Sequence, residues 1–521
     1  MHTPDSLTLA DDLERNARLY PHKTAFVYED RRLTHAQFLD RAKRLASALH
    51  KSMAKRQDRI SILAQNCMQF IEIYGACEFA GFIATTINFR LAAPEMAYII
   101  KDSAPRVLFF ESAYTEIIGQ LRSDLTSVSQ FVCIPDGTGH CPDWATNYET
   151  FIQTGEAHGP PYRAQPDDIL YLIYTSGTTG RPKGCMHRHP AVRSWAQLMS
   201  IAHNQMADER ALLMMPFFHV GAKFVQVSLH ALGSTVFIQR GFDLDSVLQC
   251  IAREKITLTH MAPMMVQSLL ESTELKNFDL SSVRTILYGA APMPRPLLRR
   301  GLDLLGPVFI QTYGQTETVG TSLARHEHCP DGSEEMRKRL SSVGRPYVNT
   351  ELKIVDSNDL ECPAGSPGEV VVRSSAQFSG YWNNSSATLE ALRDGWVYTG
   401  DIGKLDSEGF LYLVDRKKDV IISGGENIYS REVEEAILQH SAVNECAVIG
   451  VPDEKWGEAV CAVIVLNQGY SVSEQELIEH CKTVIASYKK PKMVIFASSI
   501  PKLPSGKVSK VELRNLYINS Q

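Results

Sequence analysis

The sequence predicts an α/β fold with a large N-terminal region of doubly wound sheets, a small barrel and a small C-terminal α/β domain. Strand-like apolar runs alternate with helical patterns along most of the chain, which is typical of parallel sheets covered by helices on both faces. Two runs at residues 350–355 and 368–373 have the alternation of antiparallel strands, and charge density rises abruptly at residues 415–419 before a last α/β stretch. A length of 521 residues suits roughly three domains or subdomains.

The individual elements follow from local signals. Thr8 is a suitable N-cap for a helix that ends before Pro21, and Thr34 is a suitable N-cap for the next helix. A hairpin is expected over residues 24–33. Strands are predicted over residues 59–63, 84–88, 106–110, 169–174, 211–215, 257–261, 283–288 and 308–313, and helices over residues 67–82, 94–101, 242–254 and 294–305.

Two segments interrupt this alternation. Residues 136–166 are rich in Gly, Pro and Thr and are interpreted as a surface linker. After the charged segment, a helix is expected over residues 431–440 and strands over residues 445–451 and 459–466, and Ser473 and Glu476 form a capping box for another helix. We place the domain boundary between Lys417 and Lys418, which gives domains 1–417 and 418–521.

Composition excludes several classes of protein. The net charge of −6 gives no electrostatic reason to expect nucleic acid. The eleven Cys are scattered and odd in number, which indicates reduced thiols in a cytoplasmic enzyme. The polar, acidic N-terminus is unlike a signal peptide, and the C-terminus carries no peroxisomal address. Glu72 and Glu78 interrupt the most apolar stretch, so it is interpreted as a buried helix and not a membrane span.

A strand followed by a loop of Ser, Thr and Gly is the strongest functional signal. The loop is Thr175-Ser176-Gly177-Thr178-Thr179-Gly180-Arg181-Pro182-Lys183-Gly184. Glycines let backbone N–H groups approach phosphate oxygens, hydroxyls donate further bonds, and cations offset charge. The Walker A spacing is absent. The alternative is a flexible surface loop.

Two further motifs follow predicted strand ends, where ligands bind in open parallel sheets. In Tyr313-Gly314-Gln315-Thr316-Glu317-Thr318, the aromatic ring can stack on a base and the carboxylate can bind Mg²⁺. In Gly289-Ala290-Ala291-Pro292, small residues let a base lie against the backbone. The alternatives are a core Tyr with a solvated Glu, and a simple strand-to-helix turn.

Other candidate residues are individually weaker. His219 follows two aromatics, and such a His is usually structural. Asp401 can accept bonds from two ribose hydroxyls, or it can be an ordinary turn residue. Lys418 belongs to a basic turn and Lys507 to a glycine loop, and both have a solvated alternative. Gly424 and Gly425 form a glycine turn.

These motifs closely resemble the signatures of the adenylate-forming superfamily, which includes acyl-CoA synthetases, adenylation domains of peptide synthetases and firefly luciferase. The resemblance covers nearly the whole chain. It is strongest with bacterial CoA synthetases for fatty acids and phenylpropanoid-type acids, as in residues 421–427 and 451–458. The resemblance implies an ATP-dependent acyl-CoA synthetase that uses Mg²⁺ and CoA, with a mobile C-terminal domain.

The resemblance also implies residue roles. Thr175, His219, Glu317 and Lys507 would be catalytic, with Glu317 binding Mg²⁺ and His219 lying beside the carboxylate of the acid. Lys507 would reach that carboxylate and the α-phosphate. Lys418 would be the hinge. The remaining nucleotide and CoA contacts would be Ser176, Gly177, Thr178, Thr179, Gly180, Lys183, Gly289, Ala290, Ala291, Tyr313, Gly314, Thr316, Asp401, Arg416, Gly424 and Gly425.

The acid is less determined than the chemistry. A medium- or long-chain fatty acid is expected, with an aromatic acid or a carrier-protein acceptor as alternatives, and a homodimer is left open. Lys223 in the expected acid pocket is either solvated or directed at a second polar group of the substrate.

His187 and His189 are expected to be exposed. His326-Glu327-His328-Cys329 looks like a metal cluster, but adjacent residues project to different sides. A peptide synthetase domain, a luciferase-like oxygenase and a non-catalytic adenylate sensor remain competing interpretations.

Overall fold

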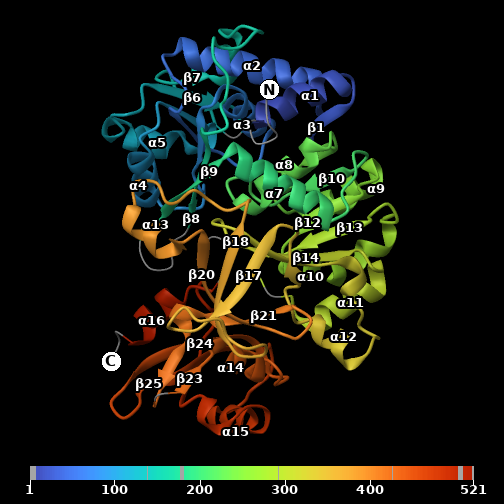
Figure 1. Ribbon diagram of the computed structural model, residues 1–521, viewed down its shortest axis with the longest axis vertical. Coiled ribbons are helices and arrows are strands. Elements are labelled where there is room, and N and C mark those ends of the chain that lie inside the picture. Colours follow the sequence, from blue (N-terminus) through green and yellow to red (C-terminus); the bar gives the residue numbers. More distant parts are fainter. Residues whose placement is uncertain are drawn as a thin grey trace. The chain divides into compact units, whose positions relative to one another are not determined.

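The structure is a computed structural model that describes residues 7–137, 139–175, 181–291, 293–424, 426–502 and 508–518 (Figure 1). The chain divides into two compact units. The first comprises Met1–Leu352 and Val372–Val397, and the second comprises Lys353–Val371 and Tyr398–Gln521. The fold is α/β, as predicted. The boundary proposed between Lys417 and Lys418 concerns a functional movement and stays a prediction.

One sheet of the first unit carries the strand that precedes the phosphate loop. Its strand order is β7-β6-β5-β3-β4-β8-β9, parallel except for the antiparallel pair β8 and β9. The strands are β3 (Arg59–Leu63), β4 (Ile83–Thr86), β5 (Val107–Glu111), β6 (Gln130–Ile134), β7 (Thr146–Asn147), β8 (Ile169–Thr175) and β9 (Lys183–Arg188).

The second sheet of this unit carries the other nucleotide motifs. Its order is β16-β15-β14-β13-β12-β10-β11-β1-β2, parallel from β14 to β1 and antiparallel at both edges. The strands are β1 (Thr24–Tyr28), β2 (Arg31–Thr34), β10 (Arg210–Leu213), β11 (Thr235–Ile238), β12 (Leu258–Met261), β13 (Thr285–Tyr288), β14 (Phe309–Gly314), β15 (Val319–Leu323) and β16 (Arg345–Pro346).

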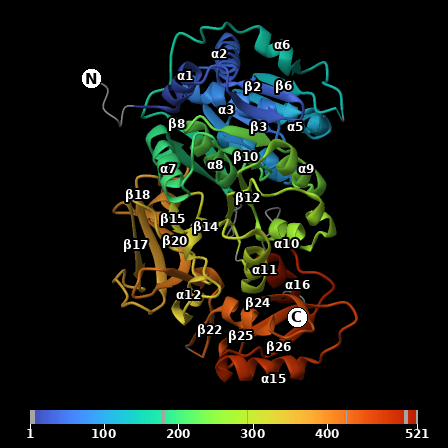
Figure 2. The same cartoon turned by 90° about the vertical axis from the view of Figure 1, so that its right-hand side faces the viewer.

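Helices cover both faces of these sheets. The helices are α1 (Leu9–Leu19), α2 (His35–Lys51), α3 (Met68–Ala80), α4 (Ala93–Ser103), α5 (Thr115–Leu121), α6 (Tyr148–Gln153), α7 (His189–Ala202), α8 (Val220–Ala231), α9 (Leu244–Glu254), α10 (Pro263–Glu271), α11 (Arg295–Leu305), α12 (Glu334–Arg339) and α13 (Ser385–Ala391). One core joins both sheets to α1, α2, α3, α7 and α8 (Figure 2). The helices α4 and α5 pack on the outer face of one sheet, and α9, α10 and α11 pack on the outer face of the other (Figure 1). This layering is the predicted doubly wound arrangement.

The helix α3 is the expected buried helix, and its carboxylates are neutralised. Glu72 accepts bonds from Arg31 at 2.6 Å, from Arg41 at 2.6 Å and from the Tyr148 hydroxyl at 2.7 Å. Tyr148 begins α6, which lies inside the stretch expected to be a surface linker. That expectation was wrong for this part, because α6 buries Tyr148 and Phe151 against the core.

A further sheet has the order β17-β18-β20-β19, with β21 beside β20, where the sequence predicts the small barrel. Its strands are β17 (Thr350–Val355), β18 (Gly368–Ser374), β19 (Leu392–Arg393), β20 (Trp396–Leu405) and β21 (Leu411–Arg416), and the division between the units falls within β17, β18 and β20.

The second unit ends in the expected small α/β region. Its sheet has the order β23-β22-β25-β24, with β26 beside β25. The elements are β22 (Ile421–Ser423), β23 (Glu426–Ile428), α14 (Ser430–Ile437), β24 (Val443–Asp453), β25 (Gly457–Leu466), α15 (Glu474–Val484), β26 (Met493–Phe496) and α16 (Lys510–Ile518). Ser473 and Glu476 form the predicted capping box of α15.

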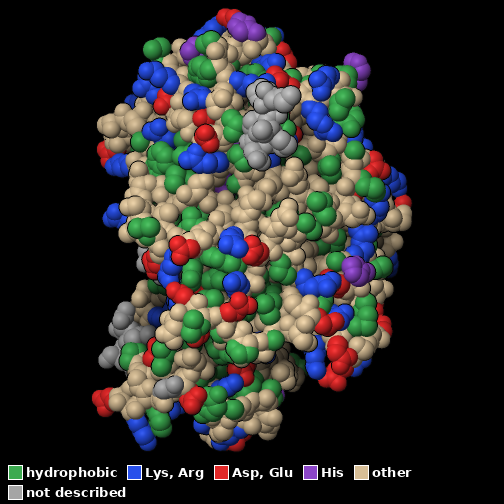
Figure 3. Space-filling model, viewed as in Figure 1, with side chains coloured by type: hydrophobic (Ala, Val, Ile, Leu, Met, Phe, Trp, Pro, Cys, Tyr) green, Lys and Arg blue, Asp and Glu red, His purple; other side chains and the backbone are tan. Residues whose placement is uncertain are grey.

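The visible surface agrees with the near-neutral composition. On the face drawn in Figure 3, basic and acidic side chains are interspersed. Within the part of the chain that the structure describes, no helix has the length and apolar character needed to cross a bilayer.

Several histidines of the first unit are buried. His187 and His189, which were expected to be exposed, are buried; His187 packs against the Phe224 ring and His189 accepts a bond from the Leu9 backbone N–H at 3.1 Å. The expectation failed because β9 and α7 are covered by elements distant in sequence. Burial lowers the pKa of His187 and of His189 to about 3, so both are neutral at pH 7.

We expect these buried histidines to make the first unit acid-sensitive. The folded-state pKa of each histidine lies below the unfolded value of about 6.5. Their contribution to the free energy of unfolding is therefore fully present above pH 6.5 and is lost as the pH falls toward the folded-state pKa. Replacing His187 with Phe should therefore reduce the loss of unfolding free energy between pH 7.5 and 5.5 by about 1.4 kcal/mol. Urea unfolding at both pH values measures this, with exposed His158→Gln as the control. An equal pH dependence in wild type and His187→Phe would contradict it.

Candidate active site

The strands β8 and β9 frame the predicted phosphate loop. Thr175 pairs in register with Lys183, and the Thr175 hydroxyl donates to the Lys183 carbonyl at 3.4 Å. The predicted loop residues Ser176, Gly177, Thr178, Thr179 and Gly180 lie outside the described residues. The loop therefore connects two antiparallel strands, so its two ends are fixed next to each other.

The segment 378–382 joins this hairpin to the Glu317 motif. The Phe378 N–H donates to the Glu317 carbonyl at 2.8 Å, and the Trp382 N–H donates to the Gly184 carbonyl at 2.8 Å. Between them, the Ser379 N–H and the Met186 carbonyl are 2.8 Å apart, and the Met186 N–H bonds to Gly380. Two motifs carried by different sheets are thereby held against one short strand-like segment.

Tyr381, in the middle of this segment, contacts both predicted phosphate-site charges. Its hydroxyl donates to Oε1 of Glu317 at 2.7 Å. The Lys183 Nζ lies 4.9 Å from the centroid of its ring. Burial raises the pKa of the Tyr381 hydroxyl, and the Glu317 carboxylate adds to the effect, so the hydroxyl stays a donor. A carboxylate held in this way offers hard oxygen, which fits Mg²⁺.

The predicted adenine contacts lie at the carboxyl ends of β13 and β14. A Cβ on Gly289 would come within 2.6 Å of the Thr312 carbonyl oxygen, and one on Gly320 would come within 2.8 Å of the Tyr313 ring. Tyr313 and the exposed Gly314 end β14, whereas Thr316 is buried. Ala290 has φ +65 and is exposed beside Ala291. The backbone approaches closely here, as a flat base against a sheet edge requires.

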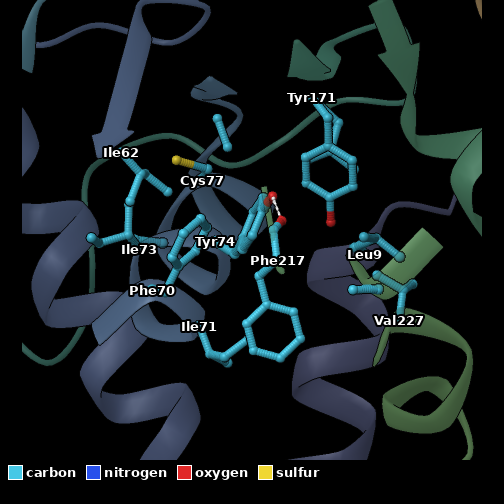
Figure 4. Close-up of a cluster of buried hydrophobic side chains, with 14 of the residues drawn as sticks. Leu9, Ile62, Phe70, Ile71, Ile73, Tyr74, Cys77, Tyr171, Phe217 and Val227 are labelled. Atoms are coloured by element: carbon cyan, nitrogen blue, oxygen red, sulfur yellow. Dashed lines mark hydrogen bonds between the residues drawn. The ribbon is translucent and has the colours of Figure 1, made fainter. Parts of the chain in front are cut away.

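His219 is exposed at the start of α8, and buried side chains hold the loop before it. Asn66 donates to the Met215 carbonyl at 2.9 Å, Tyr74 donates to the Phe217 carbonyl at 2.9 Å, and Thr86 donates to the Phe218 carbonyl at 3.0 Å. Figure 4 shows Tyr74 reaching Phe217 within the buried cluster. The chain therefore reaches His219 along a fixed path.

In the second unit, Asp401 and Arg416 form a direct pair. They lie opposite each other on β20 and β21, and Nε of Arg416 lies 2.6 Å from Oδ1 of Asp401. Asp401 is buried, and Arg416 is partly exposed. The pair presents a carboxylate and a guanidinium together, the donor and acceptor set that suits a ribose or phosphate.

The predicted hinge residue Lys418 and the predicted glycine turn come next along the second unit. Lys418 is exposed, and partial desolvation lowers the pKa of its ammonium group. Gly424 has φ +62, and a Cβ there would come within 2.6 Å of the Trp456 ring. Gly425 and Lys507 lie outside the described residues, and Lys502 pairs with Val508 across the segment that contains Lys507.

Comparisons with known proteins agree with these motifs. The family model "AMP-binding enzyme" matches residues 13–382, and "AMP-binding enzyme C-terminal domain" matches residues 432–507. The chain is 36% identical to a feruloyl-CoA synthase of Amycolatopsis sp over 96% of this chain and 98% of that protein. It is 34% identical to the long-chain-fatty-acid–CoA ligase FadD13 of Mycobacterium tuberculosis over 97% of each.

The chain belongs to the adenylate-forming superfamily of AMP-binding enzymes. It is an acid–thiol ligase of the acyl-CoA synthetase branch. Among solved structures, it resembles the o-succinylbenzoate CoA synthetase MenE of Bacillus subtilis in complex with an acyl-adenylate, with a TM-score of 0.85 and 30% identity over 98% of each chain.

The ligase does not present Lys223 to solvent or to a substrate. This side chain is 1% exposed, and its ammonium donates to Glu78 at 2.7 Å and to Gln226 at 2.6 Å. The ring of Tyr74 lies 4.0 Å from Nζ. Both interpretations of Lys223 from the sequence were wrong, because its charge is neutralised by a carboxylate on α3.

Within residues 326–329, the side chains of Glu327 and His328 are engaged with different partners. Nε2 of His328 lies 2.9 Å from the Tyr288 hydroxyl, and its Nδ1 lies 2.9 Å from the Ala324 carbonyl. Glu327 accepts from Arg345 at 2.7 Å. Among the residues that the structure describes, no group of three potential metal ligands is found.

Tyr381 is the site residue that sequence reasoning missed. It follows Gly380, a positive-φ turn at φ +122, in a Gly-Tyr-Trp run. That run was a signal of a tight turn with a buried aromatic, but nothing local connects it with Glu317, which lies 64 residues earlier.

The buried Lys223–Glu78 pair yields a stability prediction. Glu78→Gln leaves a buried ammonium without its counter-charge and should cost about 3–5 kcal/mol, whereas Glu78→Gln combined with Lys223→Met should recover most of it. Urea unfolding of the single and double variants measures the coupling. The exposed Lys255–Asp279 pair is the control, and Lys255→Met should leave the free energy of unfolding almost unchanged. Additive effects of the two core substitutions would contradict this prediction.

Proposed function

We propose that this ligase activates a carboxylic acid with ATP and transfers the acyl group to CoA, and that the acid is a medium- or long-chain fatty acid. The observation that carries the proposal is the convergence of Lys183 and Glu317 on Tyr381. A cation beside the phosphate loop and a carboxylate suited to Mg²⁺ are what ATP needs at its phosphates.

Two bond exchanges are required. A carboxylate oxygen of the acid attacks the α-phosphorus of ATP, the bond to pyrophosphate breaks, and an acyl-adenylate remains. The thiolate of CoA then attacks the acyl carbon, and the bond to AMP breaks. Both reactions require the reacting groups to be positioned and the negative charge of the phosphates to be offset. Positioned cations and hydrogen-bond donors therefore supply most of the rate enhancement.

Residues of the first unit would hold ATP and the acid. Ser176, Gly177, Thr178, Thr179, Gly180 and Lys183 would contact the phosphates, with Thr175 at the loop entrance. Gly289, Ala290, Ala291, Tyr313 and Gly314 would contact the adenine. Glu317 would hold Mg²⁺, which when bound neutralises phosphate charge, and the neighbouring Thr316 would contact the nucleotide. His219 would orient the carboxylate of the acid.

Residues of the second unit would act in turn. Asp401 and Arg416 would hold the ribose, and Lys507 would offset charge at the carboxylate and α-phosphate during adenylation. The proposed rotation of domain 418–521 about Lys418 would then bring Gly424 and Gly425 to the thiol arm of CoA. Such hinge motions are common in ligand-closing proteins.

Apolar surroundings support a fatty acid. In the first turn of α8, Val220 is buried and Gly221 has no side chain, and the charge of Lys223 is already neutralised by Glu78. A second polar end on the acid would find no charged partner at Lys223. An aromatic acid of the ferulate or benzoate type is the alternative, and a carrier protein in place of CoA is another.

Pyrophosphate release with MgATP, with and without CoA, tests this function on acetate, octanoate, palmitate, benzoate and ferulate. We expect release that depends on octanoate or palmitate and becomes multiple-turnover only with CoA. Lys507→Ala should reduce it by roughly 10²–10³-fold, whereas Lys502→Ala, which removes a lysine paired with Glu445, should not. A preference of the enzyme for ferulate would contradict the fatty-acid proposal and favour an aromatic acid as the substrate. Release that stays stoichiometric with CoA would indicate another acceptor.

The Gly424 turn should affect only the second exchange. In Gly424→Ala, a methyl group meets the Trp456 ring at a backbone conformation unfavourable for alanine, so the turn must move. We expect thioester formation from acyl-adenylate to fall at least about tenfold with adenylation within about twofold. Gly469→Ala is the control, since Gly469 has φ +83 and open space around it. Equal loss in both half-reactions would contradict separate roles.

A further inference from the structure

Tyr381 contacts two oppositely charged site residues, Glu317 and Lys183. It is 8% exposed, and its backbone bridges Cys185 on β9. Bonds on either side of it join the same segment to Glu317 and to Gly184. The backbone that carries the ring is therefore fixed by main-chain bonds that do not involve the Tyr381 hydroxyl.

The two ends of the side chain contact different charges. The hydroxyl donates to Glu317 at 2.7 Å, and the face of the ring lies 4.9 Å from the Lys183 ammonium. A phenol hydroxyl stabilises a carboxylate, and the negative face of an aromatic ring attracts a cation. Lys183 and Glu317, both described, form no direct ion pair within 4.0 Å, although both contact this one residue.

We propose that Tyr381 is a positioning residue that keeps Lys183 and Glu317 from neutralising each other. It holds one oxygen of Glu317 with a neutral donor and gives the ammonium a neutral resting surface. Lys183 thereby remains available for phosphate and Glu317 for Mg²⁺. This inference rests on the proposed function, because it takes ATP and Mg²⁺ as the ligands of these residues.

Two substitutions separate the contacts. Tyr381→Phe removes the hydroxyl and keeps the ring, so it should raise the divalent-cation concentration for half-saturation about tenfold and change ATP affinity little. Tyr381→Leu removes both contacts and lets the charges pair, so ATP affinity should also fall about fivefold or more. In a Glu317→Gln background, Tyr381→Phe should add no further loss, because the hydroxyl acts through that carboxylate.

Two measurements read these changes. Mn²⁺ binding in the presence of ATP is followed by electron paramagnetic resonance, which needs no turnover, and acid-dependent ATP–pyrophosphate exchange is followed against Mg²⁺ concentration. Tyr162→Phe is the matched control, since it removes a hydroxyl that donates to the Ala54 carbonyl at 3.0 Å elsewhere in the same unit. Thermal midpoints confirm folding of each variant.

The outcomes distinguish this inference from the proposed function. A Mn²⁺ midpoint in Tyr381→Phe equal to those of wild type and Tyr162→Phe would overturn the role of Tyr381, even if exchange is normal. Absence of exchange with every acid, with Mn²⁺–ATP binding still weakened in Tyr381→Phe, would overturn the function and support the role. If Tyr381→Phe does not fold, Lys183→Met and Glu317→Gln decide, because failure of either to weaken Mn²⁺–ATP binding overturns the inference.

Discussion

The backbone bonds between residues 378–382, β9 and Glu317 are the constraint on which the site of the first unit depends. The phosphate hairpin belongs to one sheet and the Tyr313-to-Thr318 motif to another, so neither sheet alone places them together. Main-chain bonds to Gly184, Met186 and Glu317 fix the register between them. These bonds are made by backbone groups, and side chains of the segment add to them: Phe378 is buried, and the Trp382 indole donates to the Asp102 carbonyl at 3.1 Å. The side chain of Tyr381 contacts charges on both sides.

Buried charges on α3 are paired with residues of other elements, and these pairs hold α3 and α8 in place. Glu72 and Glu78 both lie on α3; one is bonded to two arginines and a tyrosine, and the other to Lys223 and the Tyr171 hydroxyl. Breaking one partner of such a pair leaves an uncompensated charge, which makes alternative packings of α3 and α8 costly. Tyr74 on the same helix also bonds to Phe217. The path to His219 is thus tied to the best-buried helix of the unit.

Local signals predicted the fold well, but they did not predict the surroundings of several candidate residues. Thr8 and Thr34 are the predicted N-caps of α1 and α2, and Ser473 forms the predicted capping box with Glu476, because each signal depends on residues close together in the sequence. The strands that lead to Gly289 and Tyr313 were also predicted from local signals, because a continuous apolar run indicates a buried strand. Tyr381, Lys223 and His187 were missed or misjudged because their environments come from partners far along the chain. Glu78, for instance, lies 145 residues before Lys223, and no window of sequence shows that the lysine has a counter-charge.

The neutralised Lys223 also bears on how the proposed acid is selected. A lysine free to bind a second carboxylate would discriminate strongly, because a substrate without that group would leave a buried charge unpaired. Here the ammonium is already bonded to Glu78 and Gln226, and the adjacent Phe224 packs on Trp195 with ring centroids 4.5 Å apart. An apolar wall discriminates by shape, and one methylene is worth only about 1–3 kcal/mol. Selection among fatty acids of neighbouring length should therefore be graded, whereas a charged tail should be rejected by the cost of leaving it without a partner.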